Sequence, residues 1–224
     1  MTMGHLTTRG YDMGVIERKE REKELRSESI IDAAERIFFN KGFEHATMND
    51  VAEEAELSKG ALYLYFHSKN ELCMAILQRS LHILKDFFEI LQNDNNYTGI
   101  EKVSKLADLF IAFAKEHPNH YNSLLSYREH RENCPASGKI IKSTIKENKK
   151  INEIISDIIK MGQADRTIKK DIDPEKLSLA IWGNFTGIMP SCILNDKEIL
   201  NFIPENIIKY HFELIIDAIR IQGV

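Results

Sequence analysis

Apolar residues recur with the spacing of an α-helix from Ile30 to Ile219, and this spacing constrains the fold more than any other feature. Few segments alternate apolar and polar residues as a half-buried strand requires. The clearest helical stripe lies between residues 139 and 161, where isoleucines gather on one face that needs a partner surface. The sequence therefore predicts an all-α fold whose larger part is an antiparallel helical bundle.

The composition of the 224 residues, 43% of them hydrophobic, supports a globular protein with a buried core. The apolar runs are too short to span a membrane, and residues 1–15 lack the apolar centre of a secretory signal. Cys73, Cys134 and Cys192 are far apart and form no CxxC pair, which argues against disulfides and a zinc site. We expect a cytoplasmic protein with reduced thiols and no membrane partner.

Start and stop signals divide the N-terminal part into three short helical segments before a longer one. The first helix ends at Gly42, and Thr47 and Ser58 are N-caps for the second and third. Ser68 and Glu71 form an S-x-x-E start signal ahead of a long amphipathic helix. This arrangement is typical of a three-helix helix-turn-helix domain.

The charge distribution does not by itself indicate a nucleic-acid partner, since the net charge is −4. Within residues 1–70, ten Lys and Arg stand against thirteen Asp and Glu. Between Glu56 and Glu71, however, Lys59, His67 and Lys69 occur without any carboxylate. A DNA contact should therefore lie in this window.

The window also contains residue types that packing explains poorly. A turn of Ser58, Lys59 and Gly60 can approach phosphates and base edges, and Tyr63 and Tyr65 carry hydroxyls that can donate to phosphate. A generic three-helix unit would explain the small and apolar scaffold residues. It would not favour a glycine and two tyrosines in one short helix.

The segment from Ala33 to Leu72 resembles the DNA-binding domain of the TetR family of bacterial and archaeal transcriptional regulators. The matching residues keep the family's order and spacing: Ala33, Ala34, Phe38, Lys41, Gly42, Phe43, Thr47, Val51, Ala52, Ala55, Leu57, Ser58, Lys59, Gly60, Leu62, Tyr63, Tyr65, Phe66, Ser68, Lys69 and Leu72. At one position the chain departs from the family, because Glu56 stands where a glycine is usual in the turn. A side chain at positive φ there would cost up to about 1 kcal/mol.

The resemblance implies a recognition helix near residues 58–64, a homodimer, double-stranded operator DNA as partner and a small-molecule effector, so far unidentified, in the C-terminal domain. Regulation by repression is the family's usual mode. The residues that the resemblance and the charge window together assign to DNA contact are Thr47, Ser58, Lys59, Gly60, Tyr63, Tyr65, His67 and Lys69.

We divide the chain into a charged arm (1–28), a helix-turn-helix domain (29–72) and a helical domain for dimerisation and effector binding (73–224). The arm is either solvated or a helical extension, because oppositely charged residues sit at i,i+4 spacing. The fourth helix, from Ser68 through Leu91, could transmit displacement between the two domains. Further helices are predicted near 100–116, 119–131, 139–161, 174–189 and 204–221.

Two groups of residues in the C-terminal domain are candidates for binding. The first is a candidate effector pocket, for which core packing is the alternative: Phe110, Phe113, Tyr127, Arg128, Trp182, Phe185 and Met189. The second covers more than one face of the last helix and is a candidate dimer interface: Ile207, Ile208, His211, Phe212, Ile215 and Ile219.

No catalytic constellation, nucleotide-binding fingerprint or metal-ligand spacing can be read, so we expect no enzyme activity, no cofactor and no metal. His117 and His120 flank Pro118 without a convincing third ligand. Two alternatives stay open. One is a helical-bundle enzyme or carrier with an attached helix-turn-helix, and the other is a regulator without a ligand, which a filled apolar core would favour.

Overall fold

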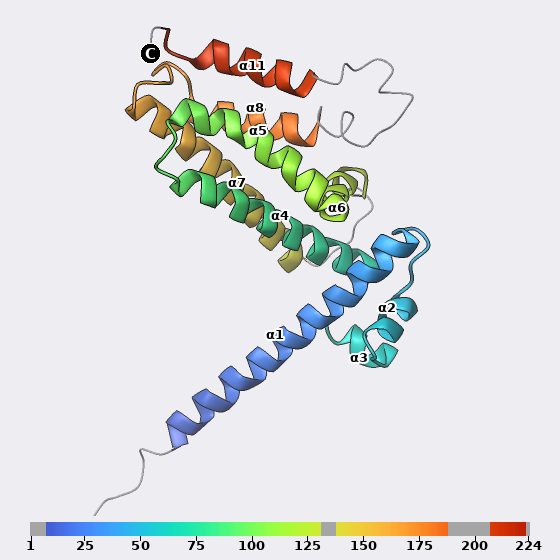
Figure 1. Cartoon of the computed structure of the whole chain (residues 1–224). Coiled ribbons are helices and arrows are strands. Elements are labelled where there is room, and N and C mark those ends of the chain that lie inside the picture. Colours follow the sequence, from blue (N-terminus) through green and yellow to red (C-terminus); the bar gives the residue numbers. More distant parts are fainter. Residues whose placement is uncertain (1–7, 131–137, 188–206, 223–224) are drawn as a thin grey trace, which may run out of the picture. The chain divides into compact units, whose positions relative to one another are not determined.

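The computed structural model describes residues 8–130, 138–187 and 207–222, and it confirms the all-α prediction. Within this part of the chain the extended pairing amounts to one isolated β-bridge, between Ile168 and Arg220. The helices (Figure 1) are α1 (Thr8–Lys41), α2 (Met48–Glu54), α3 (Lys59–Tyr63), α4 (Lys69–Asn93), α5 (Gly99–Glu116), α6 (Pro118–His130), α7 (Gly138–Ala164), α8 (Pro174–Thr186) and α11 (Ile207–Ile219).

The chain divides into two compact units, one up to Ile76 and one from Leu77 onward. Helix α4 contributes residues to both, since Leu72 is buried in the first unit and Leu81 and Leu84 are buried residues of the second. The sequence placed the end of the DNA-binding domain at residue 72, about one helical turn earlier than this division.

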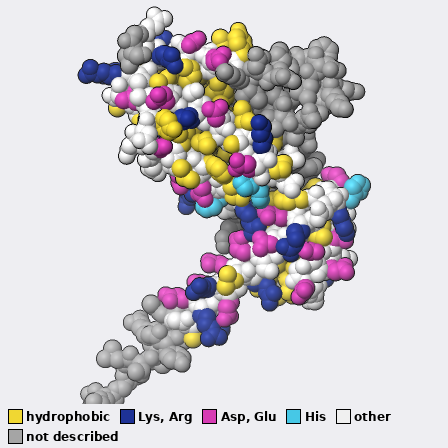
Figure 2. Space-filling model, in the orientation of Figure 1, with side chains coloured by type: hydrophobic (Ala, Val, Ile, Leu, Met, Phe, Trp, Pro, Cys, Tyr) yellow, Lys and Arg dark blue, Asp and Glu magenta, His cyan; other side chains and the backbone are white. Residues whose placement is uncertain are grey.

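In the first unit, α1 continues back to Thr8, so the described part of the expected arm is helical. The side chains of residues 14–29 are exposed except that of Ser27, which is half-buried. On the face that Figure 2 shows, Lys and Arg side chains are intermixed with Asp and Glu side chains along the described part of this extension. The core begins at Ile30 and comprises Ile30, Ile31, Ala33, Ala34, Phe38, Ala46, Val51, Ala52, Leu62, Phe66, Leu72 and Ile76.

The second unit is a helical bundle in which α7 packs on α5 and α8, and α11 packs on α5. The predicted stripe on α7 is confirmed, because Ile151, Ile155, Ile158 and Ile159 are fully buried. In the described residues of both units, no helix is long and apolar enough to cross a membrane.

The junction between α5 and α7 depends on two glycines in backbone contact. A Cβ on Gly99 would lie 2.1 Å from the Cα of Gly162. The first amides of α5 are satisfied across this junction, because Gly99 N donates to Asp165 Oδ2 at 2.6 Å and Ile100 N donates to Thr167 Oγ1 at 3.1 Å. The close approach fixes the depth at which α5 meets the end of α7.

Candidate nucleic-acid interface

The start of α2 is fixed by a reciprocal capping box between Thr47 and Asp50. Asp50 N donates to Thr47 Oγ1 at 3.2 Å, and the backbone N–H and the hydroxyl of Thr47 both donate to Asp50 Oδ2 at 2.8 Å. Lys41 Nζ donates to the other carboxylate oxygen at 2.7 Å. The Lys41 hydrogen bond, followed by those of Thr47, lowers the pKa of Asp50 to about 2. The Thr47 hydroxyl proton is therefore used within the cap. The expected contact of Thr47 with DNA stays a prediction.

The turn between α2 and α3 has a positive φ at Glu56, where the family usually has a glycine. Glu56 adopts φ 54°, the left-handed region where a glycine is favoured. Hydrogen bonds hold the turn, since Glu56 N donates to Glu53 O at 3.0 Å and Leu57 N donates to Ala52 O at 2.8 Å. The glutamate therefore adopts the left-handed conformation in a turn that backbone hydrogen bonds hold.

Helix α3 is anchored on one side and bare on the other. Ser58 caps it by accepting from Ala61 N at 3.2 Å, and Leu62 is fully buried beneath it. Lys59, Gly60 and Tyr63 are exposed. A Cβ built on Gly60 would meet no atom within 4 Å, so packing inside the chain does not require a glycine there. The bare side of α3 is open to an external partner.

Lys69 is engaged within the chain, and its expected phosphate contact stays a prediction. Its ammonium donates to three backbone carbonyls, Phe43 O at 2.6 Å, Ala46 O at 3.1 Å and Glu44 O at 3.3 Å. It also lies 4.4 Å from the centroid of the Phe43 ring. Since an ammonium has three N–H donors, all of them are occupied by the loop between α1 and α2. Lys69 holds this loop and has no N–H left for a phosphate in this state.

Tyr65 and His67 differ in their surroundings. Tyr65 is half-buried and packs against the core of the first unit, so it is less accessible than the sequence suggested. His67 is exposed, and its backbone N–H donates to Glu71 Oε2 at 2.7 Å. Ser68 Oγ accepts from Glu71 N at 3.2 Å, so the predicted start signal of the fourth helix is confirmed.

The interface carries little uncompensated positive charge. Arg36 donates to the Glu54 carboxylate, and Lys41 is paired with Asp50. Lys59 is exposed and takes part in no ion pair or hydrogen bond within the described part of the chain. The electrostatic contribution of α3 therefore comes from Lys59.

Sequence reasoning missed one exposed residue of this surface. Leu64, the C-cap of α3, is 77% exposed, the largest value among the large hydrophobic side chains that the structure describes. Its αR backbone continues the helical geometry, so it lies one turn after Gly60 on the same face. The i,i+4 spacing from Gly60 was the available signal.

The expected effector residues that the structure describes pack mainly against each other. The rings of Phe110 and Phe185 stack with centroids 4.4 Å apart, and Phe212 stacks on Phe185 at 5.5 Å. Phe110, Phe113 and Phe185 are fully buried, and Trp182 is half-buried. The residues that lie outside the described side chains are Tyr127, Arg128 and Met189. An effector pocket at these residues stays a prediction.

The expected dimer residues are divided between the interior and the surface of their own subunit. Phe212 and Ile219 are buried within their own chain, whereas His211 and Ile215 are half-buried, so the dimer interface stays a prediction. The side chains of Ile207 and Ile208 lie outside the described residues. The exposed large hydrophobic residues in the described part of α8 and α11 are Leu179, Tyr210 and Leu214.

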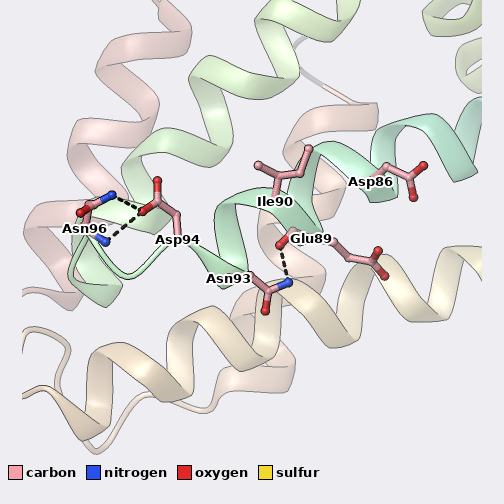
Figure 3. A pocket seen from close by; sticks show the side chains of 6 residues that line it. All are labelled: Asp86, Glu89, Ile90, Asn93, Asp94 and Asn96. Carbon is pink, nitrogen blue, oxygen red and sulfur yellow. Dashed lines mark hydrogen bonds between the residues drawn. The ribbon is translucent and has the colours of Figure 1, made fainter.

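An open pocket lies at the C-terminal end of α4 (Figure 3), and its polar groups are largely engaged with one another. Asn93 Nδ2 donates to Glu89 O at 2.9 Å, and Asn96 donates through its backbone and side chain to Asp94 Oδ1. Among the described residues, no three His, Cys, Asp or Glu side chains are grouped as metal ligands. The residues that line the pocket are Asp86, Glu89, Ile90, Asn93, Asp94 and Asn96.

Residues 30–76 match the family described as bacterial regulatory proteins, tetR family. This segment therefore forms a TetR-family domain. The matched segment contains the Thr47 cap, the Glu56 turn and α3, so the exposed side of α3 belongs to the TetR-family domain.

Curated relatives of this TetR-family domain are named as transcriptional regulators. The HTH-type regulator TtgR of Pseudomonas putida is 44% identical over 68 residues, 30% of this chain and 31% of the relative. The uncharacterized regulator YfiR of Bacillus subtilis is 44% identical over 59 residues, 26% of this chain and 29% of the relative. The chain thus spans less than a third of the length of these relatives.

Solved structures extend the similarity of fold to most of the chain. The fatty acid degradation regulator FadR from Bacillus halodurans has a TM-score of 0.64 at 15% identity and covers 85% of this chain and 94% of its own. FadR from Bacillus subtilis, solved in complex with stearoyl-CoA, has a TM-score of 0.62 at 18% identity, covering 88% and 98%. Both carry the TetR-family arrangement of an N-terminal helix-turn-helix and a helical C-terminal domain.

Proposed function

We propose that the chain is an operator-binding homodimeric repressor whose DNA affinity is controlled by a small effector in the second unit. The observation that carries the proposal is the bare side of α3. Lys59 and Tyr63 are exposed beside Gly60, where a side chain would meet nothing in the chain. A helix with such a surface can enter the major groove and bring its backbone close to the bases.

Effector control is the finer part of this proposal. FadR from Bacillus subtilis, which has a similar fold, was solved in complex with stearoyl-CoA. Cavities between the helices of a bundle are common sites for small ligands. The aromatic stack of Phe110, Phe185 and Phe212 supplies apolar walls, and the cluster of Ser80, His120 and Ser123 supplies polar groups in the same unit. An effector need only bind the DNA-competent and DNA-incompetent states with different affinity.

Exposed apolar residues on α8 and α11 support the homodimer. Leu179 is 60% exposed, Tyr210 54% and Leu214 50%. Gly183 on α8 is exposed, and a Cβ there would meet nothing within 4 Å, so a second copy could approach this helix closely. An isologous interface buries the same patch on both subunits.

The experiment is to select bound duplexes from a random DNA pool and compare Gly60→Ala with Gly14→Ala. Both glycines lie in helices with open space where the Cβ would be, so each change should stabilise its helix by up to about 1 kcal/mol. We expect Gly60→Ala to weaken operator binding at least tenfold, because the added methyl separates α3 from the bases, and Gly14→Ala to leave it unchanged.

Enrichment of no duplex would refute the DNA-binding function. Equal operator affinity in wild type and Gly60→Ala would show that α3 does not approach the DNA by this face. Effector control is tested separately, by titrating a candidate ligand with and without operator, since linkage requires both affinities to change by the same factor.

A further inference from the structure

The exposed side chain of Leu64 adds an apolar group to the surface of α3, and phosphate contacts by Lys59 and Tyr63 give no reason for an apolar group there. Leu64 is 77% exposed, whereas Leu62 two residues earlier is fully buried in the core. Side chains on a helix lean toward its N-terminus, so the Leu64 isobutyl group lies over the turn that contains Gly60. Gly60 has no side chain to cover it.

The result is a strip of bare backbone with an apolar edge. Lys59 and Tyr63 border this strip on the same short helix, and both are exposed. A partner for the strip must tolerate a cation and accept hydrogen bonds from a phenol, yet offer an apolar group to Leu64. The major groove of DNA has this combination, because phosphates line its edges and the 5-methyl of thymine projects into it.

We infer that Leu64 is a specificity-determining residue that contacts the 5-methyl group of a thymine in each operator half-site. The inference rests on the proposed function, since it requires α3 to enter the major groove. It adds the chemical identity of one base position. Lys59 is the cation that α3 offers to phosphates, and phosphate contacts do not distinguish one DNA sequence from another. A base contact by Leu64 would therefore contribute to sequence specificity.

The size of the effect follows from the burial of one methyl group. Removing a buried methyl corresponds to about a fourfold loss of affinity in each half-site, and about fifteenfold for a dimer that reads two half-sites. Uracil lacks only the 5-methyl group of thymine, so replacing thymine by deoxyuridine removes this contact and leaves base pairing intact.

The test is a double-mutant cycle that combines base changes in the operator with substitutions at Leu64. The operator is taken from random-pool selection on the full-length protein. Each thymine of the bound duplex is replaced in turn by deoxyuridine, and affinity is measured by fluorescence anisotropy. For wild type we expect one thymine position per half-site at which the methyl matters. For Leu64→Ala we expect the same duplexes to bind equally, and for Leu64→Met the methyl effect to persist.

Ile90→Ala is the matched control, because Ile90 is 72% exposed and lies in the second unit. It should retain the full methyl dependence. The inference is overturned if wild type shows no methyl dependence at any thymine, or if the dependence survives in Leu64→Ala. It is also overturned if Leu64→Ala changes the oligomeric state in sedimentation, because Leu64 would then belong to a protein interface. Failure of every duplex to bind would overturn the proposed function as well. This outcome distinguishes a failure of DNA binding itself from a failure of the Leu64 contact alone.

Discussion

Lys69 Nζ donates to Phe43 O at 2.6 Å and lies above the ring of the same residue. The phenylalanine belongs to the loop between α1 and α2, so one side chain at the start of α4 holds a loop more than twenty residues earlier in the chain. A lysine that the sequence pattern assigns to DNA thus stabilises the domain that presents α3.

Lys69→Ala is expected to lower the stability of the first unit by about 2 kcal/mol, because hydrogen bonds from a charged donor are lost and three carbonyls lose their partner. Lys59→Ala, at an exposed position without an ion pair, should change stability by less than about 0.5 kcal/mol. Thermal unfolding measures both. Lys69→Met, which keeps the apolar stem, separates loss of the ammonium from loss of packing.

The salt dependence of operator binding should change in the Lys59 variant and not in the Lys69 variant, the reverse of the effect on stability. Lys59→Ala is expected to make the slope of log K against log salt shallower by about one per subunit, and Lys69→Ala to leave it unchanged. A shallower slope in Lys69→Ala with unchanged stability would return Lys69 to the phosphate contacts.

The difference between these lysines shows where prediction from sequence stops. Helix positions from residue 99 to 164 agreed with the structure within three residues at each end, because apolar periodicity and capping residues are local signals. The partner of Lys69 is set by the tertiary approach of a loop, and no local pattern encodes it. The burial of Phe212 and Ile219 is of the same kind, since the stripe on α11 does not say which of its faces its own subunit covers.

Glu56→Gly should stabilise the first unit by about 0.5 kcal/mol. The gain arises because Glu56 adopts φ 54°, and it is reduced by the greater freedom of glycine in the unfolded chain. Glu56→Ala retains the Cβ and should give no gain. Arg166→Gly is a parallel case in the second unit, with φ 67°. Chemical denaturation would refute the strain argument if the alanine variant gained as much as the glycine variant.

The Thr47–Asp50 cap should show an acid dependence confined to low pH. The pKa of Asp50 is lowered from 3.8 to about 2, so the cap contributes stability above about pH 4 and loses it as the pH falls toward 2. The difference in melting temperature between wild type and Asp50→Asn should therefore be constant from pH 5 to 7 and shrink below pH 4. Glu53→Gln removes a charge from the same helix without touching the cap. A difference for Asp50→Asn that stays constant down to pH 2 would contradict the role of Lys41 and Thr47 in lowering this pKa.

The dimer surface can be tested with substitutions at two positions of similar exposure. Leu214 on α11 is 50% exposed and Ile145 on α7 is 57% exposed, so replacing either by Asp buries no charge in the isolated subunit. If α8 and α11 form the interface, Leu214→Asp places two carboxylates in a desolvated contact and should yield folded monomers in sedimentation, whereas Ile145→Asp should stay dimeric. Ile219→Asp is unsuitable for this purpose, because Ile219 is 3% exposed and the change would unfold its own unit. Circular dichroism of both variants serves as the folding control, since an unchanged helical spectrum means that assembly and not folding has changed. Monomers from Ile145→Asp together with dimers from Leu214→Asp would place the interface on α7 instead.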